Sequence, residues 1–344
     1  MQLDQEVNEK PMTRREMRQT IGTEINRMEV RYFVDLYYQL QEYRKAGGNQ
    51  TRAANESNEP PGEFAKFIQG GFVKTEEKIK TYLDEMMDRT VVGAWAKSIV
   101  GIGPVISAGL LAHIDIRQAP TVGHIWRFAG LDPTQHWLGA AKAKARLDER
   151  IAGGASLDTA IPIMADEIGC KPETLLKLAT FDRDGEPIKL TQATLTKACA
   201  KRPWNAALKV LCWKIGESFV KTCNNPQGFY GQIYQARKMQ EEAKNARGDF
   251  ADQAATVMAS KRIGKATEAY KAYSVGKLPP AHIHARSKRV AVKLFLAHWQ
   301  EVAWFAEYGQ LPPKPYVIDR LGHADLIHPP NMELVPGLAE AHGR

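Results

Sequence analysis

The stretch that most constrains the fold of this chain is a Gly-Ile-Gly-Pro turn at residues 101–104, set between two apolar segments. Glycine adopts positive φ or lets another backbone approach closely, so two glycines permit a tight reversal. Proline suits the first turn of a helix, where the amide that it lacks would have no intrahelical partner. Ile99 before the turn and Val105 after it would close a small apolar joint. The pattern predicts two short helices joined by this turn over residues 98–111.

This helix-hairpin-helix pattern also points to a ligand. The second helix would begin at the turn with its first amides exposed, and such amides bind phosphate oxygens of DNA. The alternative is an ordinary tight turn between two helices. The full pattern, apolar-x-Gly-apolar-Gly-Pro, is more specific than a lone Gly-x-Gly, and it favours the interpretation as a DNA-binding turn.

Composition narrows the class of protein. The chain has 344 residues, enough for two or three domains, and a net charge of +8 that favours a polyanionic partner. Its four cysteines form no CxxC pair, which is typical of reduced residues in an intracellular protein rather than of disulfides or a zinc site. No apolar run is long enough to span a membrane, and the N-terminus lacks a secretory pattern. We expect a cytoplasmic, nucleoid-associated protein.

Helical periodicity dominates the chain, and no run of residues reads convincingly as a strand. We therefore predict a mainly α fold, with a long antiparallel helix pair followed by a helical domain that contains the hairpin. The predicted organisation is a disordered tail at 1–12, a helical hairpin at 13–90, the helix-hairpin-helix region at 91–150, an insertion at 151–190, a helical C-terminal body at 191–310 and an extended tail at 311–344.

The predicted helix pair at 13–90 begins with a helical pattern from Thr13 that Ala46-Gly47-Gly48 is expected to end. A polar linker follows through residue 62, and a second helix is expected over about 63–89, where Gly70-Gly71 would bend or interrupt it. Such a pair often serves as a coiled-coil dimerisation arm. The alternative is that its apolar stripe packs within one chain.

The inserted segment carries a second possible DNA signal. Residues 165–175 place a small residue, a turn glycine and an apolar residue at helix-turn-helix spacing, although such matches are common by chance and a plain helical turn is the alternative. Asp182 and Asp184 suggest a metal site, but the calcium-loop pattern is incomplete and a solvated turn is favoured.

Basic residues near these motifs are candidates for phosphate contact. A helix predicted from Pro280 to Tyr308 carries His282, Arg286, Arg289 and Lys293 at steps of four, three and four, which form one cationic stripe. The alternative is a solvated charged face. The predicted DNA-binding residues are the turn residues Gly101, Ile102, Gly103, Pro104 and Val105, together with Lys97, Arg127, Lys142, Lys144, Arg146, Arg286, Arg289 and Lys293.

Three phrases resemble one protein family. Ile-Val-Gly-Ile-Gly-Pro-Val at 99–105, Leu-Leu-Ala-His-Ile at 110–114 and Phe-Ala-Gly-Leu-Asp-Pro at 128–133 are similar to the C-terminal domain of DEDD-type, bridge-RNA-guided insertion-sequence transposases. In that family a helix-hairpin-helix precedes a short helix that ends in an Ala-Gly-Leu-x-Pro-like phrase. The predicted helix pair also stands where the family places its coiled coil.

The departures from the family bear on chemistry. The family has an N-terminal RuvC-like α/β domain with four acidic residues that hold divalent metal, whereas this N-terminus reads as helical. The family's nucleophilic serine lies in a Ser-Gly phrase shortly after Ala-Gly-Leu-x-Pro. Here residues 134–139 read Thr-Gln-His-Trp-Leu-Gly, without a serine, and Thr134 is too close to the phrase to replace it.

Together these observations predict a non-catalytic, transposase-derived protein that binds duplex or branched DNA, mainly through its backbone, as a homodimer or higher oligomer. We predict no catalytic residue, no metal site and no cofactor. The alternatives are an active recombinase or structure-specific nuclease of a mobile element or phage, and a scaffold that binds RNA or protein.

Overall fold

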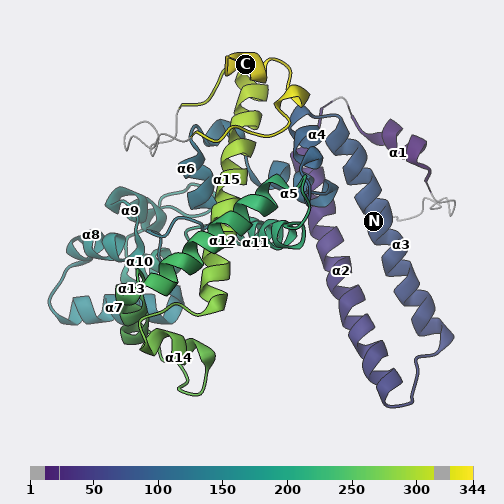
Figure 1. Cartoon of the computed structure of the whole chain (residues 1–344). Helices are drawn as coiled ribbons and strands as arrows, with labels where there is room; N and C mark the ends of the chain where they lie inside the picture. The colour runs from purple at the N-terminus through teal and green to yellow at the C-terminus, as the bar shows by residue number, and fades with distance from the viewer. Residues whose placement is uncertain (1–11, 23, 314–325, 344) are drawn as a thin grey trace. The chain divides into compact units, whose positions relative to one another are not determined.

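Helices form the regular structure of residues 12–22, 24–313 and 326–343, which are the part of the chain that the computed structural model describes (Figure 1). Within these residues the backbone forms no strand, only an isolated antiparallel bridge between Phe181 and Pro187, so the mainly α prediction is confirmed. The predicted tail at 1–12, apart from residue 12, and residues 314–325 of the predicted C-terminal tail lie outside the described residues.

The α-helices are α1 (Arg14–Thr20), α2 (Arg27–Glu56), α3 (Glu63–Asp88), α4 (Val91–Ser98), α5 (Pro104–His113), α6 (Val122–Phe128), α7 (Gly139–Ala152), α8 (Leu157–Ile168), α9 (Pro172–Thr180), α10 (Gln192–Ala200), α11 (Ala206–Lys221), α12 (Phe229–Arg247), α13 (Ala251–Ser260), α14 (Glu268–Ser274), α15 (Pro280–Tyr308) and α17 (Leu338–Ala341).

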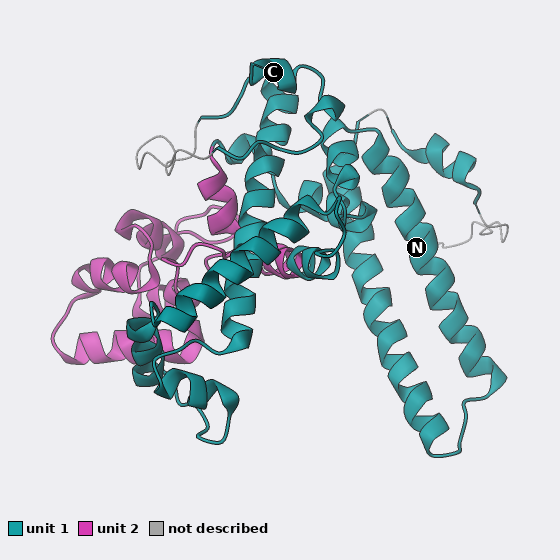
Figure 2. Cartoon of the chain, viewed as in Figure 1, with its two compact units in different colours: residues 1–120, 214–344 teal, residues 121–213 magenta. Residues whose placement is uncertain are grey.

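The chain forms two compact units (Figure 2). Unit 1 comprises residues 1–120 and 214–344, and unit 2 comprises residues 121–213. The hairpin α4–α5 lies in unit 1, with the long helices α2, α3 and α15. This division into two units does not test the domain boundaries expected from the sequence, which stay predictions.

The N-terminal helices differ from the prediction in two places. The helix expected from Thr13 onward is interrupted after Thr20, because a capping box at Thr13 starts α1 and the side chain of Asn26 caps a separate α2. The helix also does not end at Gly47-Gly48 but continues to Glu56. A Cβ on Gly47 would lie 1.4 Å from Nε2 of Gln69 in α3, so the glycine serves close helix packing rather than termination.

The second glycine pair also leaves its helix intact. Helix α3 runs without interruption through Gly70-Gly71, where an added Cβ would meet no heavy atom within 4 Å. Glycine costs a helix interior about 1 kcal/mol relative to alanine, and tertiary packing of the rest of the helix overrides that cost. That packing is a buried cluster between α2, α3 and α5 with Val30, Val34, Ile79, Leu83, Met86, Met87, Val105 and Ala108 at its centre.

Unit 2 has its own core, built from α7 to α10. The basic segment 139–150, expected to be helical or flexible, is helical, and it buries Ala143 and Leu147 while its cations face outward. The other core residues are Ala160, Ile161, Met164, Ala165, Ile168, Leu175, Ala179, Leu195, Ala198 and Cys199. All four cysteines of the chain are free thiols.

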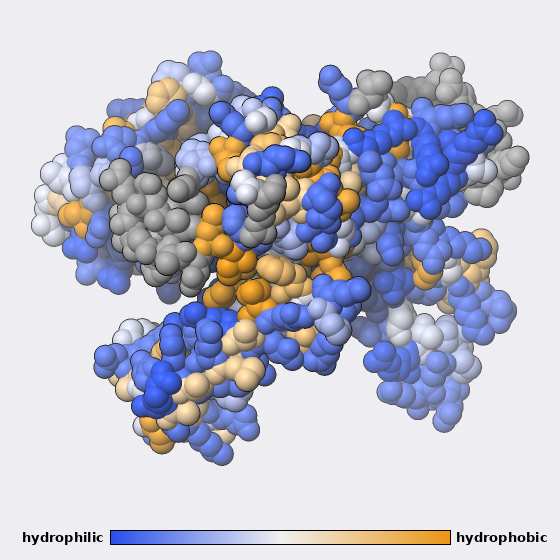
Figure 3. Space-filling view, turned by 45° about the horizontal axis from the view of Figure 1, so that its top comes forward, coloured by the Kyte–Doolittle hydropathy of each residue, from blue (hydrophilic) through white to orange (hydrophobic). Residues whose placement is uncertain are grey.

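The described helices include no candidate for a membrane span, and some apolar side chains are exposed. No described helix is both long enough and apolar enough to cross a bilayer. Figure 3 shows a face that is mainly hydrophilic, with hydrophobic residues gathered in separate patches. Early in α3 several large apolar side chains are exposed, namely Phe64, Phe67, Ile68 and Val73.

Candidate nucleic-acid interface

The predicted hairpin is present in unit 1, with α4 and α5 packed against each other around the turn. Gly101 has φ of +95°, a conformation that only glycine adopts without strain. The amide of Ile102 donates a 2.9 Å hydrogen bond to the carbonyl of Ile99, which closes the turn. Gly103 is the N-cap of α5, and Pro104 occupies its first turn. The two glycines therefore perform different tasks.

One side of the turn is covered by α11. The hydroxyl of Ser218 donates a hydrogen bond to the carbonyl of Gly101. A Cβ on Gly101 would lie 3.0 Å from Oγ of Ser218 and 3.2 Å from Oγ1 of Thr222. The side chain of Ile102 is buried. Gly101 and Ile102 thus build the joint, and their side of the turn is closed to a ligand.

The other side of the turn is open. Gly103 is exposed, and a Cβ placed on it would meet no heavy atom within 4 Å. The amides at the start of α5, at Val105 and Ile106, precede the first intrahelical acceptor and have no partner in the helix. The side chain of Val105 is buried, so only its backbone amide is available at this edge. This geometry suits an anion such as a phosphate.

The segment that contains this hairpin matches a known protein family. Residues 94–153 match the model of the transposase IS116/IS110/IS902 family. The matched residues include the hairpin turn, the Ala-Gly-Leu-Asp-Pro phrase and all of α7. No curated protein and no solved structure matches the chain. The chain therefore contains a transposase-like segment.

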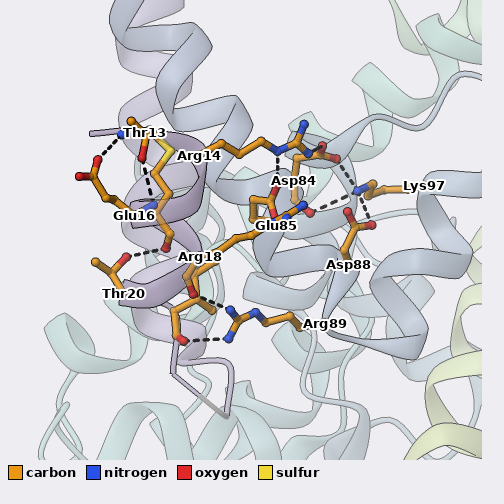
Figure 4. A network of polar contacts seen from close by, with 12 residues as sticks. Thr13, Arg14, Glu16, Arg18, Thr20, Asp84, Glu85, Asp88, Arg89 and Lys97 are labelled. Carbon is orange, nitrogen blue, oxygen red and sulfur yellow. Dashed lines mark hydrogen bonds and ion pairs between the residues drawn. The ribbon is translucent and has the colours of Figure 1, made fainter. Parts of the chain in front are cut away.

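Lys97, next to the turn of the transposase-like segment, is engaged within unit 1. Its ammonium pairs with the carboxylates of Asp84 and Asp88 at the end of α3, in a network that also contains Glu85 with Arg14 and Arg18 (Figure 4). Partial burial lowers the pKa of Lys97, but the hydrogen bonds that its ammonium donates to both carboxylates outweigh this effect and raise the pKa above its ordinary value. Lys97 thus remains charged, with that charge balanced locally.

The predicted cations of the transposase-like segment in unit 2 are all exposed and differ in whether they have a partner within the chain. Arg127 donates a 2.7 Å hydrogen bond to the carbonyl of Gly169, and Arg146 pairs with Glu167 at 3.1 Å. Lys144 pairs with Asp148 one turn along α7. Lys142 is exposed and forms no ion pair within the described chain.

The cationic stripe on α15 divides in the same way. Arg286 donates a 2.6 Å hydrogen bond to the buried carboxylate of Glu241 in α12 and lies over the ring of Phe250. Its main contact is therefore structural. Arg289 is exposed and forms no ion pair with a described residue, while Lys293 is half-buried and has an interaction partner. His282 accepts or donates a 3.0 Å hydrogen bond with the hydroxyl of Tyr273.

Sequence reasoning did not include Ser218 and Thr222 in the turn. They stand more than 110 positions after Gly101, and no local pattern links them. Asp182, considered for a metal, accepts hydrogen bonds from the amides of Asp184 and Glu186 in a tight turn. No group of three or more His, Cys, Asp or Glu residues in the described ranges is placed to hold a metal ion.

Proposed function

We propose that this chain is a non-catalytic, transposase-derived DNA-binding protein that contacts the backbone of duplex or branched DNA. The observation that carries the proposal is the open N-terminus of α5 within a segment that matches a transposase family. Phosphate oxygens bind such free amides without reading base sequence. Exposed cations such as Lys142 and Arg289 add sequence-independent attraction, which weakens as salt rises.

The non-catalytic part rests on two departures from the DEDD-type pattern. The described residues that precede the match are helical, where that family places its metal-binding α/β domain. The residues after Ala-Gly-Leu-Asp-Pro contain Thr134 instead of the Ser-Gly phrase. The Thr134 hydroxyl donates a 2.8 Å hydrogen bond to Asp132, and the Thr134 amide donates to the same oxygen at 2.9 Å. This is a side-chain-stabilised turn, which gives Thr134 a structural task.

The structure supplies a clean test of the turn. Gly103→Glu places a carboxylate at the open edge of α5, where the new Cβ would meet no heavy atom within 4 Å. We expect duplex or junction DNA affinity to fall by about tenfold or more, because the new charge repels phosphate where one was bound. Electrophoretic mobility shift or fluorescence anisotropy at two salt concentrations measures the change, and the slope of log affinity against log salt should also become shallower.

Gly62→Glu is the matched control. Gly62 is the N-cap of α3, has an extended backbone with ψ of 171° against 177° at Gly103, and also has open space around its Cβ position. It makes the same charge change at another helix N-terminus. Equal losses of DNA affinity in the two variants, or no loss in Gly103→Glu, would show that the hairpin turn is not the contact.

A second experiment tests the absence of catalysis. The protein is incubated with Mg²⁺ or Mn²⁺ and with duplex and branched substrates, and the expected product pattern is unchanged DNA. Reproducible strand cleavage or joining that is lost on one acidic substitution, or on Thr134→Ala, would identify an active recombinase or nuclease instead.

We also propose that two copies pair through the arm formed by α2 and α3. Phe67 and Ile68 stand three and four residues after Phe64, on the same helix face, and the three side chains are 74%, 41% and 76% exposed, respectively. Such an apolar stripe is a candidate helix–helix interface. Phe64→Ser with Phe67→Ser should convert the oligomer to a monomer in analytical ultracentrifugation, and an unchanged mass would exclude this surface.

A further inference from the structure

Two tryptophans of unit 2 form a rigid aromatic corner that the hairpin contact does not use. The rings of Trp137 and Trp204 lie 6.5 Å apart at an interplanar angle of 76°. The indole N–H of Trp137 donates a 2.9 Å hydrogen bond to the carbonyl of Ala200, at the end of α10. The polar atom of Trp137 is thus satisfied and its ring is held, yet the residue remains 47% exposed.

Each ring of this corner carries a cation on its face. The guanidinium carbon of Arg202 lies 4.4 Å from the ring centroid of Trp137, and the ammonium of Lys209 lies 3.7 Å from that of Trp204. Arg202 is itself exposed. A planar guanidinium that is stacked on an indole presents its other face as a platform for a further planar group.

The backbone is shaped to keep Trp204 in position. Gly130 has φ of +66°, and a Cβ on it would lie 2.7 Å from Cγ of Trp204. The amide of Asn205 donates a 2.8 Å hydrogen bond to the carbonyl of Phe128. Two chain segments, 128–137 and 200–209, are therefore joined at this corner by contacts that fix the rings, which favours a preorganised surface over an incidental one.

Two stretches of chain at the corner carry charge of one sign, although Asp132 directly precedes the first of them. Residues 133–147 contain no Asp or Glu, and neither do residues 187–213. The cations of these two segments are Lys142, Lys144, Arg146, Lys189, Lys197, Lys201, Arg202 and Lys209. Some of them pair with acids from elsewhere in unit 2, as Arg146 does with Glu167, but the segments themselves offer no carboxylate to a polyanion. Aromatic rings held beside cations are the combination by which proteins bind unpaired nucleotides.

We infer that the corner of Trp137, Arg202, Trp204 and Lys209 is a stacking site for unpaired bases of a nucleic-acid strand, separate from the backbone contact at the hairpin turn. A base stacks on the exposed surface of Trp137 and Arg202, while Lys209 and the neighbouring cations attract the phosphates. The site is sequence-tolerant, because every base has a π face. It would let the protein prefer branched or opened DNA over a continuous duplex.

The test uses the full chain and fluorescence anisotropy with a labelled fifteen-nucleotide oligothymidylate, the same strand with abasic units, and a duplex. Trp137→Ala should weaken oligothymidylate binding by about 5- to 30-fold, the loss of one stacked base. It should change abasic-strand and duplex binding by less than about twofold. Equal loss on all three ligands, or no loss on oligothymidylate, would overturn the stacking site.

Two further variants keep the test decisive if Trp137→Ala fails to fold. Trp137→Phe keeps an aromatic face and should retain most of the oligothymidylate affinity. Arg202→Met keeps an unbranched apolar side chain but removes the planar cation, and it should lose part of the oligothymidylate affinity. A ring that merely fastens residues 133–139 to α10 would change the unfolding midpoint without changing strand binding. That outcome would assign the corner a structural role only.

Two comparisons separate this inference from other outcomes. An oligouridylate of the same length is measured beside the DNA strand. Comparable affinities mean that the site binds bases and phosphates without contacting the 2′-hydroxyl, and a markedly higher affinity for the RNA identifies RNA as the strand. If neither strand binds, the stacking site is wrong. Gly103→Glu should weaken duplex binding and leave oligothymidylate binding intact. The hairpin proposal and the stacking site can therefore fail independently.

Discussion

Two of the helix–turn–helix joints in the described chain, α4–α5 and α8–α9, have similar local sequences. In the α4–α5 joint, Gly101 has positive φ and Pro104 begins the second helix. In the α8–α9 joint, Gly169 has φ of +72° and Pro172 begins the second helix. Each uses glycine for the left-handed conformation and proline for the first helical turn. On local sequence alone, both joints are candidates for DNA contact.

Tertiary contacts separate them. The α8–α9 turn is covered: the amide of His136 donates to the carbonyl of Ile168 at 3.1 Å, and Arg127 donates to that of Gly169. The α4–α5 turn is covered at Gly101 but open at Gly103. Local residues therefore decide that a turn forms, whereas distant segments decide whether an edge of it remains for a ligand. The helix-turn-helix interpretation of residues 165–175 stays a prediction.

The largest expected effect is at the covered turn. A Cβ on Gly169 would lie 2.0 Å from the backbone carbonyl oxygen of Thr134, and its φ is unfavourable for alanine. Gly169→Ala should therefore destabilise unit 2 by about 3 kcal/mol, combining backbone strain and overpacking. Urea unfolding followed by circular dichroism measures it.

The control for that variant is Gly154→Ala, also in unit 2. Gly154 has φ of +89° but open space around its Cβ position, so only the conformational term of about 1 kcal/mol should appear. If both substitutions cost the same, the segment at Thr134 does not press on the α8–α9 turn, and the contrast between the two joints disappears.

Acid should loosen the α4–α5 joint selectively. The C-terminal segment binds α4, because the indole N–H of Trp95 donates to the carbonyl of Pro330 at 2.8 Å and Asn331 donates to Ser98 at 2.8 Å. The same segment is held by His298, whose Nε2 donates to the carbonyl of Ile327, which leaves Nδ1 to accept from the Tyr230 hydroxyl. With neutral His298 this arrangement gives both ring nitrogens and the Tyr230 hydroxyl proton a partner, whereas protonation of Nδ1 removes the acceptor of the Tyr230 hydroxyl.

Burial lowers the pKa of His298 to about 4 from 6.5. The unfolded state therefore binds more protons between these values, so this contribution to stability is complete above pH 6.5 and is lost as pH falls toward 4. At pH 4.5 the loss is about 2 to 3 kcal/mol relative to pH 8. Burial raises the pKa of the nearby Glu301, an effect of opposite sign, so the variant His298→Gln is needed to isolate the histidine.

Hydrogen exchange measures this prediction. Amides of residues 91–113 should lose protection between pH 6.5 and 4.5, after correction for intrinsic exchange rates, while those of residues 157–180 should change less. In His298→Gln the pH dependence of residues 91–113 should be reduced. Equal acid sensitivity of both joints would show that the C-terminal segment does not stabilise the hairpin selectively.

Sequence patterns predicted the helical fold and most helix positions because those depend on near neighbours. The last long helix was predicted at 280–308, and α15 spans Pro280–Tyr308. The helix end predicted at Gly47 was wrong, because glycine occurs both where a helix ends and where two helices pack closely. Only the contact with Gln69 from another helix distinguishes these two cases. A helix break after Thr20 was missed because the apolar spacing continues across it.

The candidate site was less predictable than the fold. Sequence marks a lysine or arginine but not its partner, and the partners of Lys97 and Arg286 lie on other helices, at Asp84, Asp88 and Glu241. Their assignment as DNA contacts stays a prediction. The Trp137–Trp204 corner was also invisible in the sequence, because its members are separated by more than sixty residues and meet only through tertiary contacts.

The smallest expected effect compares the two glycines of one turn. Gly101→Ala meets positive φ and the Ser218 hydroxyl at 3.0 Å, so it should cost about 1–2 kcal/mol of stability. Gly103→Ala has ordinary φ of −94° and open space, and it should change stability by less than about 0.5 kcal/mol. Thermal and urea unfolding measure both, and DNA affinity is measured in parallel. Because alanine adds no charge, Gly103→Ala should also bind DNA nearly as well as the parent protein. Similar destabilisation by both substitutions would mean that the Gly103 edge is packed and therefore closed to phosphate.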